Sequence, residues 1–567
     1  MPRSPINCGL CRESRLWASS VNFLVKGVRT VILTTWRAGL PALLALLSLR
    51  ALAAPVDPAT LARISDEGFN HGQVVETAEY LADRIGGRLT NSPAMRAAET
   101  WTMGRFTAWG LKNVHREGFE FGRGWWIESS QVRMTAPRAL VLRAIPIAWT
   151  PPTTGTLSAE VIVAPIKKER DFADWKGKLA GKIVLVSWPE PPKDDTESPT
   201  KRLADPEIGK LDEFKIPHFE PDANKRVIEY FSFGEKLDAF LAQEGAVAWA
   251  RMSRREGHIV HGEGYMFHTG GSPRLPAVEI AAEDYRKLTR LAKGGPVTLA
   301  IDNVVHYEDA DSKAYNIVAE IPGRDPKAGF VMAGAHLDSW VAGDGAADNG
   351  AGSAVILEAS RILASLGVQP RRTLRFVLWS GEEQGLWGSG AYLEQHLARR
   401  PVGNPELAAM GPYFAEETYP VQTLPEFDAL AAYFNIDNGS GKIRGIYAEG
   451  NLAVVPTLKE WLAPFSSLGA GAVVSQPTGG TDHVFLSRLG LPAFQFVQDP
   501  LDYESRVHHS ELDVFDHLRP QDLRQAAVIV AAMMLDAANA DQPLPRRVLP
   551  TQPRVTDPFA YPDPSEK

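Results

Sequence analysis

The chain has 567 residues, of which 44% are hydrophobic and 23% are charged. At about 100–200 residues per domain this length allows two to four domains, and the composition predicts a folded rather than a disordered protein. The formal net charge of −8 argues against nucleic acid as the main partner, because polyanions are recognised by basic surfaces.

The N-terminal residues are typical of an export signal. Arg29 and Arg37 precede the apolar run 38–49, and Ala51-Leu52-Ala53 follows as a small-x-small cleavage site. We therefore expect residues 1–53 to be a cleaved signal peptide and the protein to be secreted or periplasmic, without stable membrane association. The alternative is an uncleaved anchor, in which residues 31–33 extend the apolar run towards the roughly 20 residues that span a bilayer.

Removal of the signal changes both the charge and the cysteine content. Residues 1–53 hold seven Lys/Arg and one acidic residue, so the mature chain has a formal net charge of −14. Cys8 and Cys11 have the C-x-x-C spacing of redox and metal sites, but both precede the apolar run and leave with the signal. Any metal in the mature protein must then be bound by His, Asp and Glu.

The first part of the mature chain, residues 54–152, begins with a helical pattern. Apolar residues recur near a 3.6-residue period between 74 and 85, and Gly86-Gly87 interrupts them. Asn91-Ser92-Pro93 is typical of a helix start, and this second helix continues through Phe106.

A second region begins after a Pro- and Thr-rich linker at residues 150–155. We expect residues 153–303 to form an inserted β-rich domain. The polar, Pro-rich stretch 189–221 inside it predicts a long surface excursion. The strands expected in this region are 161–164, 182–187 and 297–301.

The third part, residues 304–540, alternates between strand and helix patterns, and residues 541–567 read as a mobile tail. Such alternation predicts an α/β fold, a mostly parallel or mixed sheet sandwiched by helices. The expected strands are 329–333, 373–379, 431–436 and 492–497, and the expected helices are 350–366 and 520–537.

Polar clusters follow the predicted strands of this third part. They contain His336, Asp348, the pair Glu382-Glu383, Asp437 and the pair His508-His509. Each cluster alone is more often a helix cap, a solvated turn or a surface group. Together they fall where α/β sheets place their active sites, at the carboxyl ends of strands. Imidazole and carboxylate without thiolate indicate zinc or a similar divalent ion.

The same residues resemble a known family. His336-Leu337-Asp338-Ser339-Trp340, Asp348-Asn349-Gly350, the segment 378–385 and His508-His509-Ser510 look like the co-catalytic zinc exopeptidases, which include carboxypeptidase Q, glutamate carboxypeptidase II and secreted bacterial leucine aminopeptidases. The resemblance extends roughly from residue 61 to residue 540. The insertion, with residues 276–280 near its close, is similar to the protease-associated domain of that family.

The resemblance implies two zinc ions per chain and a role for each matched residue. Asp348 would bridge the ions, His336 and Asp437 would complete one site, and Glu383 and His509 would complete the other. Three further residues would act on the reaction or orient a ligand: Glu382 as general base, Asp338 as the partner that orients His336, and His508 as a candidate oxyanion donor where many relatives carry Tyr.

Other polar groups are weaker candidates. Asn349 stands where relatives often have a second Asp, and we do not expect it to be a ligand. The Asp482-His483 pair lies in a Gly-rich loop, and we expect the pair to line the site rather than to form a simple turn. His258, His261 and His268, with Glu263 among them, read as a polar loop rather than a second metal site.

The sequence leaves several alternatives open. A non-catalytic, receptor-like binding protein on the same scaffold is the main rival, although it would be expected to lose ligands or the base. A one-zinc aminoacyl cyclase is another, although those relatives generally lack the insertion. Short peptides are the expected substrates, with aminopeptidase and dipeptidase or carboxypeptidase activity equally open; Arg506 could bind a terminal carboxylate. Relatives are often homodimers, so the resemblance implies a homodimer as one possible assembly.

Overall fold

The computed structural model describes residues 56–192, 198–215, 222–268, 271 and 273–552, all of which belong to one compact unit. The predicted signal peptide, Cys8, Cys11 and the end of the predicted tail lie outside these residues. None of the helices in the described ranges is both long and apolar enough to cross a membrane.

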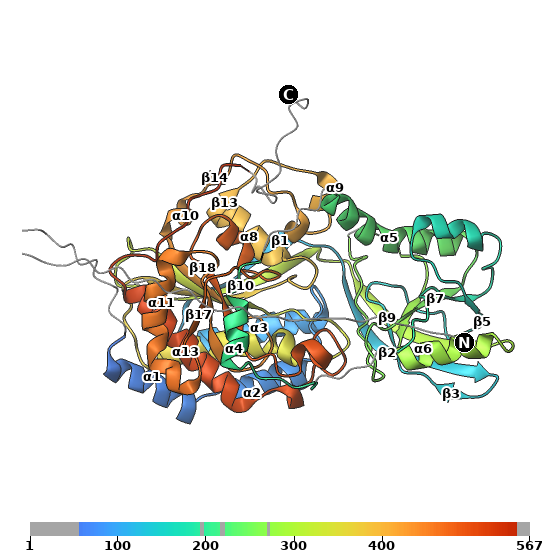
Figure 1. The fold of residues 1–567 in the computed structure, drawn as a ribbon, viewed down its shortest axis with the longest axis horizontal. Helices are drawn as coiled ribbons and strands as arrows, with labels where there is room; N and C mark the ends of the chain where they lie inside the picture. The colour runs from blue at the N-terminus through green and yellow to red at the C-terminus, as the bar shows by residue number, and fades with distance from the viewer. Residues whose placement is uncertain (1–55, 193–197, 216–221, 269–270, 272, 553–567) are drawn as a thin grey trace, which may run out of the picture. The chain divides into compact units, whose positions relative to one another are not determined.

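An eight-stranded mixed sheet forms the centre of the main part of the fold (Figure 1). Its four central strands are parallel, and antiparallel partners flank them, which confirms the expected α/β class. In spatial order the strands are β1 (Lys112–Glu120), β10 (Lys313–Ile321), β12 (Thr373–Trp379), β11 (Phe330–His336), β15 (Leu430–Asn435), β18 (Ala493–Gln498), β16 (Ile443–Tyr447) and β17 (Ala472–Val474).

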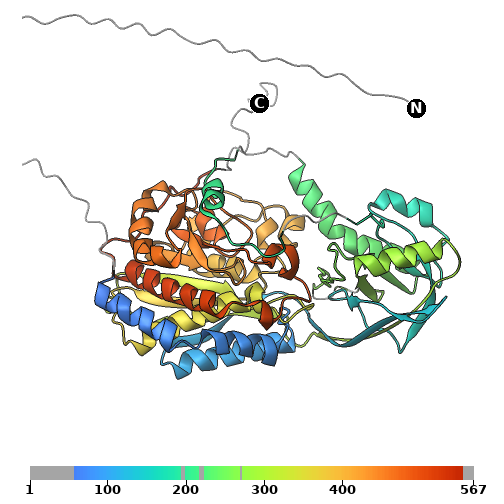
Figure 2. The same ribbon diagram turned by 60° about the horizontal axis from the view of Figure 1, so that its bottom comes forward.

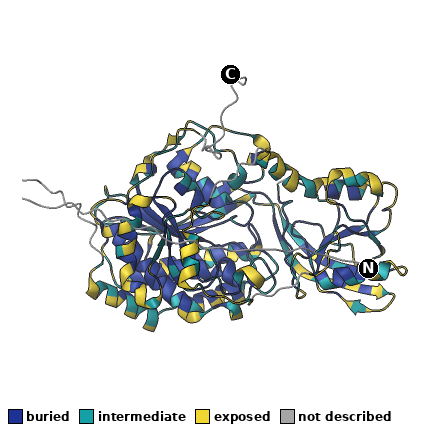
Figure 3. Ribbon diagram, viewed as in Figure 1, coloured by how far each residue is buried: buried dark blue, intermediate teal, exposed yellow. Residues whose placement is uncertain are grey.

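Helices cover both faces of this sheet, and the residues between the layers are buried (Figure 3). On one face, α7 (Ala351–Ser365) and α13 (Pro520–Asn539) pack on β11 and on each other, with α1 (Pro58–Asn70), α2 (Val74–Glu79) and α3 (Pro93–Ala108) beside them. The other face carries α8 (Trp387–Tyr392), α10 (Pro425–Ala429) and α12 (Val484–Arg488). Further elements of this part are α9 (Pro405–Ala408), α11 (Val455–Leu462), β13 (Ala398–Arg399) and β14 (Gln422–Thr423).

The N-terminal helices follow from local sequence signals. The side chain of Ser92 accepts a hydrogen bond from the Met95 amide at 3.2 Å, so the predicted cap does start α3. The predicted helix over residues 74–85 is present as α2 and its continuation η1 (Tyr80–Ile85), and it ends at Gly86, whose φ of 80° favours glycine. Helix α1 was not predicted, although Asp57 caps it.

A second eight-stranded sheet contains the predicted strands of the insertion (Figure 2). Helices α5 (Ala223–Gln243) and α6 (Ala282–Ala292) accompany it. Three of its strands precede residue 153, so the sheet begins earlier than the predicted insertion, and the division into domains stays a prediction. In spatial order the strands are β3 (Leu140–Val141), β2 (Gly124–Ala136), β9 (Thr298–Glu308), β5 (Leu157–Val163), β6 (Ile183–Leu185), β7 (Ala248–Met252), β8 (Ala277–Ile280) and β4 (Ala144–Pro146).

The described part of the predicted excursion is anchored to the main sheet. The Lys201 amide donates to the Leu501 carbonyl at 2.8 Å, and Arg202 pairs with Asp499 just after β18 at 2.8 Å. The short helix α4 (Asp205–Leu211) follows. The excursion therefore crosses to the chain segment that leads into the His508-His509 loop.

Candidate metal centre

The polar clusters predicted at strand ends meet at one edge of the first sheet. Strand β11 ends at His336, and β12 ends shortly before Glu382. Asp437 follows β15, and the loop after β18 bears His508 and His509. These four strands are parallel neighbours, so their carboxyl ends share the edge where ligands bind in α/β sheets.

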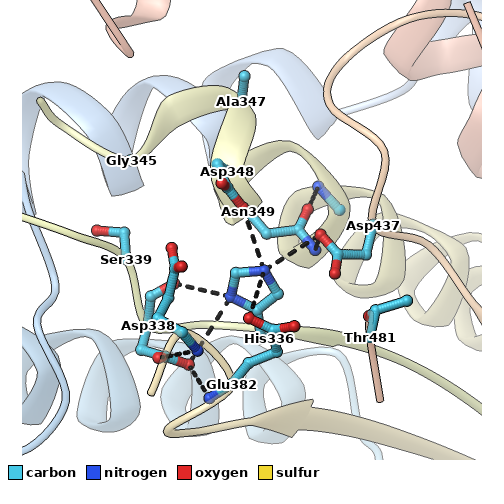
Figure 4. Close-up of polar contacts among 12 residues, drawn as sticks. His336, Asp338, Ser339, Gly345, Ala347, Asp348, Asn349, Glu382, Asp437 and Thr481 are labelled. Atoms are coloured by element: carbon cyan, nitrogen blue, oxygen red, sulfur yellow. Dashed lines mark hydrogen bonds and ion pairs between the residues drawn. The ribbon is translucent and has the colours of Figure 1, made fainter. Parts of the chain in front are cut away.

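Asp348 lies between two histidines from different strand-end loops. Its Oδ1 is 3.2 Å from Nε2 of His336, and its Oδ2 is 3.3 Å from Nε2 of His509. His336 Nε2 is also 3.2 Å from Oδ1 of Asp437 (Figure 4). On the opposite side, His509 Nε2 is 2.9 Å from Oε2 of Glu383. The Asp348 carboxylate thus lies near histidines from two different loops.

The arrangement fits divalent ions. Ligand atoms at about 2.0–2.2 Å from a tetrahedral zinc ion are about 3.3 Å apart, close to the spacings between these side chains. Oε1 of Glu383 is buried and has no hydrogen-bond partner among the described residues. Buried polar atoms are normally paired, so this oxygen is suited to ligate a cation. The candidate ligand groups are His336–Asp348–Glu383, His336–Glu382–Asp437 and Asp348–His508–His509.

The pKa shifts at this edge of the sheet also indicate a site suited to a cation. Burial opposes charging of His336, but Asp437 and Glu382 raise its pKa well above the ordinary value. Burial likewise opposes ionisation of Asp348, yet hydrogen bonds with His336 and His509 hold its pKa well below the usual range. Burial is the main cause that raises the pKa of Glu383 to about 7. A divalent ion would replace protons here, so metal binding should release them.

Asp338 was expected to orient His336, and it contacts this histidine mainly through its main-chain oxygen. Nδ1 of His336 is 3.0 Å from the main-chain oxygen of Asp338 and 3.7 Å from its carboxylate, so the carbonyl is the nearer partner. The carboxylate accepts from the Glu382 amide at 3.3 Å and from the Thr90 hydroxyl at 3.0 Å. Asp338 thus connects the histidine to the loop that bears the two glutamates.

Two further residues position Asp348 and Asp437. The carboxylate of Asp513 accepts from the Ala347 amide at 2.6 Å and the Asp348 amide at 3.0 Å, a contact that sequence reasoning missed. The side-chain amide of Asn349 donates to Asp437 Oδ1 at 3.0 Å. Asn349 thus supports Asp437 through this hydrogen bond, and the expectation that it is not a ligand stays a prediction.

A cavity of about 330 Å³ opens onto the candidate ligands. Asp348, Glu382, Glu383, Asp437, His508 and His509 all line it. The walls combine aromatic and acidic groups with a glycine-rich turn: Phe231, Tyr265, Tyr413, Phe414, Tyr503, Glu504 and residues 479–481. Phe231 and Tyr265 come from the region of the second sheet, so that region forms part of the cavity wall.

His508 and Tyr503 lie beside the carboxylate of Asp348. Nε2 of His508 is 3.7 Å from Oδ2 of Asp348, and burial lowers the pKa of His508 to about 4, which keeps the imidazole neutral near pH 7. The ring of Tyr503 lies 4.8 Å from that of His508, and its hydroxyl interacts with Asp348. Sequence reasoning missed Tyr503; its only signal was its place in the loop after the predicted strand 492–497.

Three weaker candidates from the sequence lie away from the cavity. Asp482 and His483 are fully buried and do not line the cavity, so the expectation that they line the site was wrong. Asp482 instead accepts a hydrogen bond from the Ser389 hydroxyl at 2.5 Å. Arg506 is exposed and is not a lining residue. The three histidines of the insertion are dispersed: His261 contacts Glu279, His258 lies 3.7 Å from Asp284, and His268 stacks on Phe267.

Comparison with known proteins agrees with this geometry. The model of "Peptidase family M28" matches residues 316–534, which include all the candidate ligands. Carboxypeptidase Q of Mus musculus is 27% identical over 482 residues, covering 83% of this chain and 87% of that protein.

Solved structures establish the fold. A peptidase M28 precursor from Shewanella amazonensis superposes with a TM-score of 0.61 and 23% identity, covering 87% of this chain and 99% of that one. A zinc aminopeptidase from Bacillus subtilis gives a TM-score of 0.51 and 18% identity, covering 83% and 98%. With the strand-edge residues, these matches show that residues 316–534 resemble peptidase family M28 and that the chain is a zinc-dependent exopeptidase.

Proposed function

We propose that the protein is a two-zinc exopeptidase that releases residues from short peptides. The observation that supports this best is the position of Asp348, whose two oxygens face His336 and His509 at 3.2 and 3.3 Å. His336 and Asp437 would bind one ion with Asp348, and Glu383 and His509 would bind the other. A pair of ions so held would lower the pKa of a water and polarise the scissile carbonyl.

The remaining residues then have distinct tasks. Glu382 lines the cavity, and its carboxylate lies 3.9 Å from His336 Nε2, farther than Asp348 or Asp437. We assign it as general base: it accepts the proton of the attacking water and returns it to the leaving amine. His508, neutral and beside Asp348, would donate to the developing oxyanion, with Tyr503 as the neighbouring donor.

The cavity favours a substrate with a free α-amine. In addition to the candidate ligands and Glu382, Glu504 adds a carboxylate to its wall. Among the described lining residues none is Lys or Arg, the groups that would bind a terminal carboxylate. We therefore propose aminopeptidase activity, with carboxypeptidase Q-like dipeptidase activity as the alternative.

A substrate panel tests both the class and the direction. Purified protein is assayed with free dipeptides, N-acetylated dipeptides and aminoacyl-anilides. We expect hydrolysis of free dipeptides and anilides and none of N-acetylated substrates. Cleavage of N-acetylated dipeptides at equal rate would contradict an aminopeptidase. Binding of peptides without turnover of any of them, with metal present, would favour the non-catalytic alternative.

The cellular setting and the assembly are further proposals. Export after removal of residues 1–53 predicts that the mature protein starts near Ala54, which N-terminal sequencing of the exported form would test; an intact Met1 on a cytoplasmic protein would contradict it. A homodimer is the expected assembly, to be measured by light scattering of the purified protein.

A further inference from the structure

One carboxylate from the region of the second sheet reaches the candidate metal centre. Glu263 lies between β7 and β8, far in sequence from every candidate ligand. Its Oε1 is 2.5 Å from Nδ1 of His509, and the two side chains are 12% and 19% exposed. The contact is therefore a short, largely buried hydrogen bond between two parts of the chain.

Glu263 is itself held in place. Arg254 contacts both of its carboxylate oxygens, and the distance from Nη2 to Oε1 is 3.0 Å. Arg251 donates to the main-chain oxygen of Glu263 at 2.8 Å. A carboxylate fixed by a two-pronged guanidinium has little freedom to turn away from the histidine.

The same region also holds the backbone of the histidine loop. Arg255 donates to the carbonyls of Glu504, Arg506 and His508 at 2.9, 3.0 and 2.7 Å. The backbone of His509 has a φ of 60°, a conformation that costs free energy in a residue with a side chain. These contacts from outside the loop help to offset that cost.

The hydrogen bond determines which nitrogen of His509 is available as a ligand. When Nδ1 donates its proton to Glu263, the lone pair of the neutral imidazole is on Nε2, which faces Asp348 and Glu383. His336 has its Nδ1 partner, the Asp338 carbonyl, on its own strand-end segment. His509 has the corresponding partner, Glu263, in the segment between β7 and β8.

We propose that Glu263 is a positioning residue of the metal centre, through which the segment between β7 and β8 completes the site at the edge of the main sheet. This proposal rests on the proposed two-zinc function. Partners of metal-bound histidines typically affect metal affinity or activity by about 10–100-fold when they are removed. Loss of Glu263 should lower the affinity of the site that contains His509 for zinc. The affinity of the site that contains His336 and Asp437 should stay nearly unchanged.

The test measures zinc affinity of the full chain by competition with a chromophoric chelator, for wild type, Glu263→Gln and Glu263→Ala. The amide oxygen of Gln can still accept from Nδ1 but lacks the charge. We expect affinity at one of two sites to fall in the order wild type, Gln, Ala, with a loss of about 10–100-fold for Ala. The absorption bands of the cobalt-substituted protein should change in the same order. Excess zinc should restore most of the activity.

Glu279→Gln is a matched control. Glu279 is another buried carboxylate of this region that pairs with a histidine, His261, at 3.0 Å and with an arginine, Arg251, at 2.9 Å, and it belongs to none of the candidate ligand groups. This variant should lower the melting temperature without changing zinc affinity. Unchanged affinity in Glu263→Ala, or an equal loss in Glu279→Gln, would overturn the positioning role alone. A wild-type chain that binds no zinc would overturn the proposed function as well.

Discussion

Glu382 and Glu383 are adjacent in the chain, but their carboxylates face different histidines. Oε2 of Glu383 lies 2.9 Å from Nε2 of His509, whereas Oε2 of Glu382 lies 3.9 Å from Nε2 of His336. Both side chains line the cavity, and both amides point back to the carboxylate of Asp338. One short turn therefore places two carboxylates near two different histidines of the candidate metal centre.

The two glutamates should be separable by mutation. Glu382→Gln keeps the shape of the side chain but removes the base, so kcat should fall by about 10²–10⁴-fold or more while metal content stays near wild type. Glu383→Gln removes an anionic ligand, so one ion should bind more weakly and added zinc should restore part of the activity. The measurement is metal stoichiometry beside turnover. Metal loss in Glu382→Gln with retention in Glu383→Gln would mean that the roles are reversed.

Mutation of Asp348 and mutation of Asp437 should affect the binding of different numbers of metal ions. Asp348 faces both histidines, so Asp348→Asn should weaken binding of both ions, whereas Asp437→Asn should weaken only the ion bound with His336. Elemental analysis after dialysis against a weak chelator checks this. Equal stoichiometry in the two variants would argue against a bridging carboxylate.

His508 is expected to contribute to the transition state rather than to metal binding. His508→Ala should lower kcat by about 10²-fold, the usual cost of one oxyanion donor, with little change in KM or zinc content. Tyr503→Phe is the comparison, because Tyr503 also lines the cavity and its hydroxyl interacts with Asp348. A larger loss of kcat in Tyr503→Phe than in His508→Ala would transfer the donor role to the tyrosine.

A buried carboxyl far from the cavity should make stability depend on pH. Burial raises the pKa of Asp536 to about 7, and its Oδ1 accepts from the Val56 amide at 2.5 Å. Its folded-state pKa is above the unfolded value, so its contribution is fully present at low pH and is lost as the pH rises through about 7. Asp536→Asn stays neutral and keeps an acceptor.

The Asn variant should therefore gain stability relative to wild type between pH 5 and pH 8, by roughly 2 kcal/mol. Urea unfolding at both pH values measures the difference. A difference between variant and wild type that is the same at both pH values would show that Asp536 ionises normally in the fold.

The sequence predicted the parts of the fold that local signals encode. The Ser92 cap, the apolar strand 373–379 and the long helix that begins at Pro520 are present because capping and hydrophobic periodicity act within a few residues. Helix α1 was missed, although Asp57 caps it and it packs on α13.

Site residues that directly follow a predicted strand could be predicted from the sequence. Site residues that are brought to the centre only by tertiary contacts could not. His336 and Asp437 could be placed because a strand end fixes both. Glu263 could not, because nothing in the polar segment around it indicates that it meets His509, 246 residues later. For the same reason the buried Asp482 was wrongly expected at the surface of the cavity.

A zinc titration of the metal-free protein is the most direct test of whether two zinc ions share Asp348. Activity on an aminoacyl-anilide is followed as zinc is added in known equivalents. We expect full activity to require two equivalents of zinc per chain, and Asp348→Asn not to reach full activity in the same range. Full activity at one equivalent, or activity unaffected by excess chelator, would rule out a shared pair of ions.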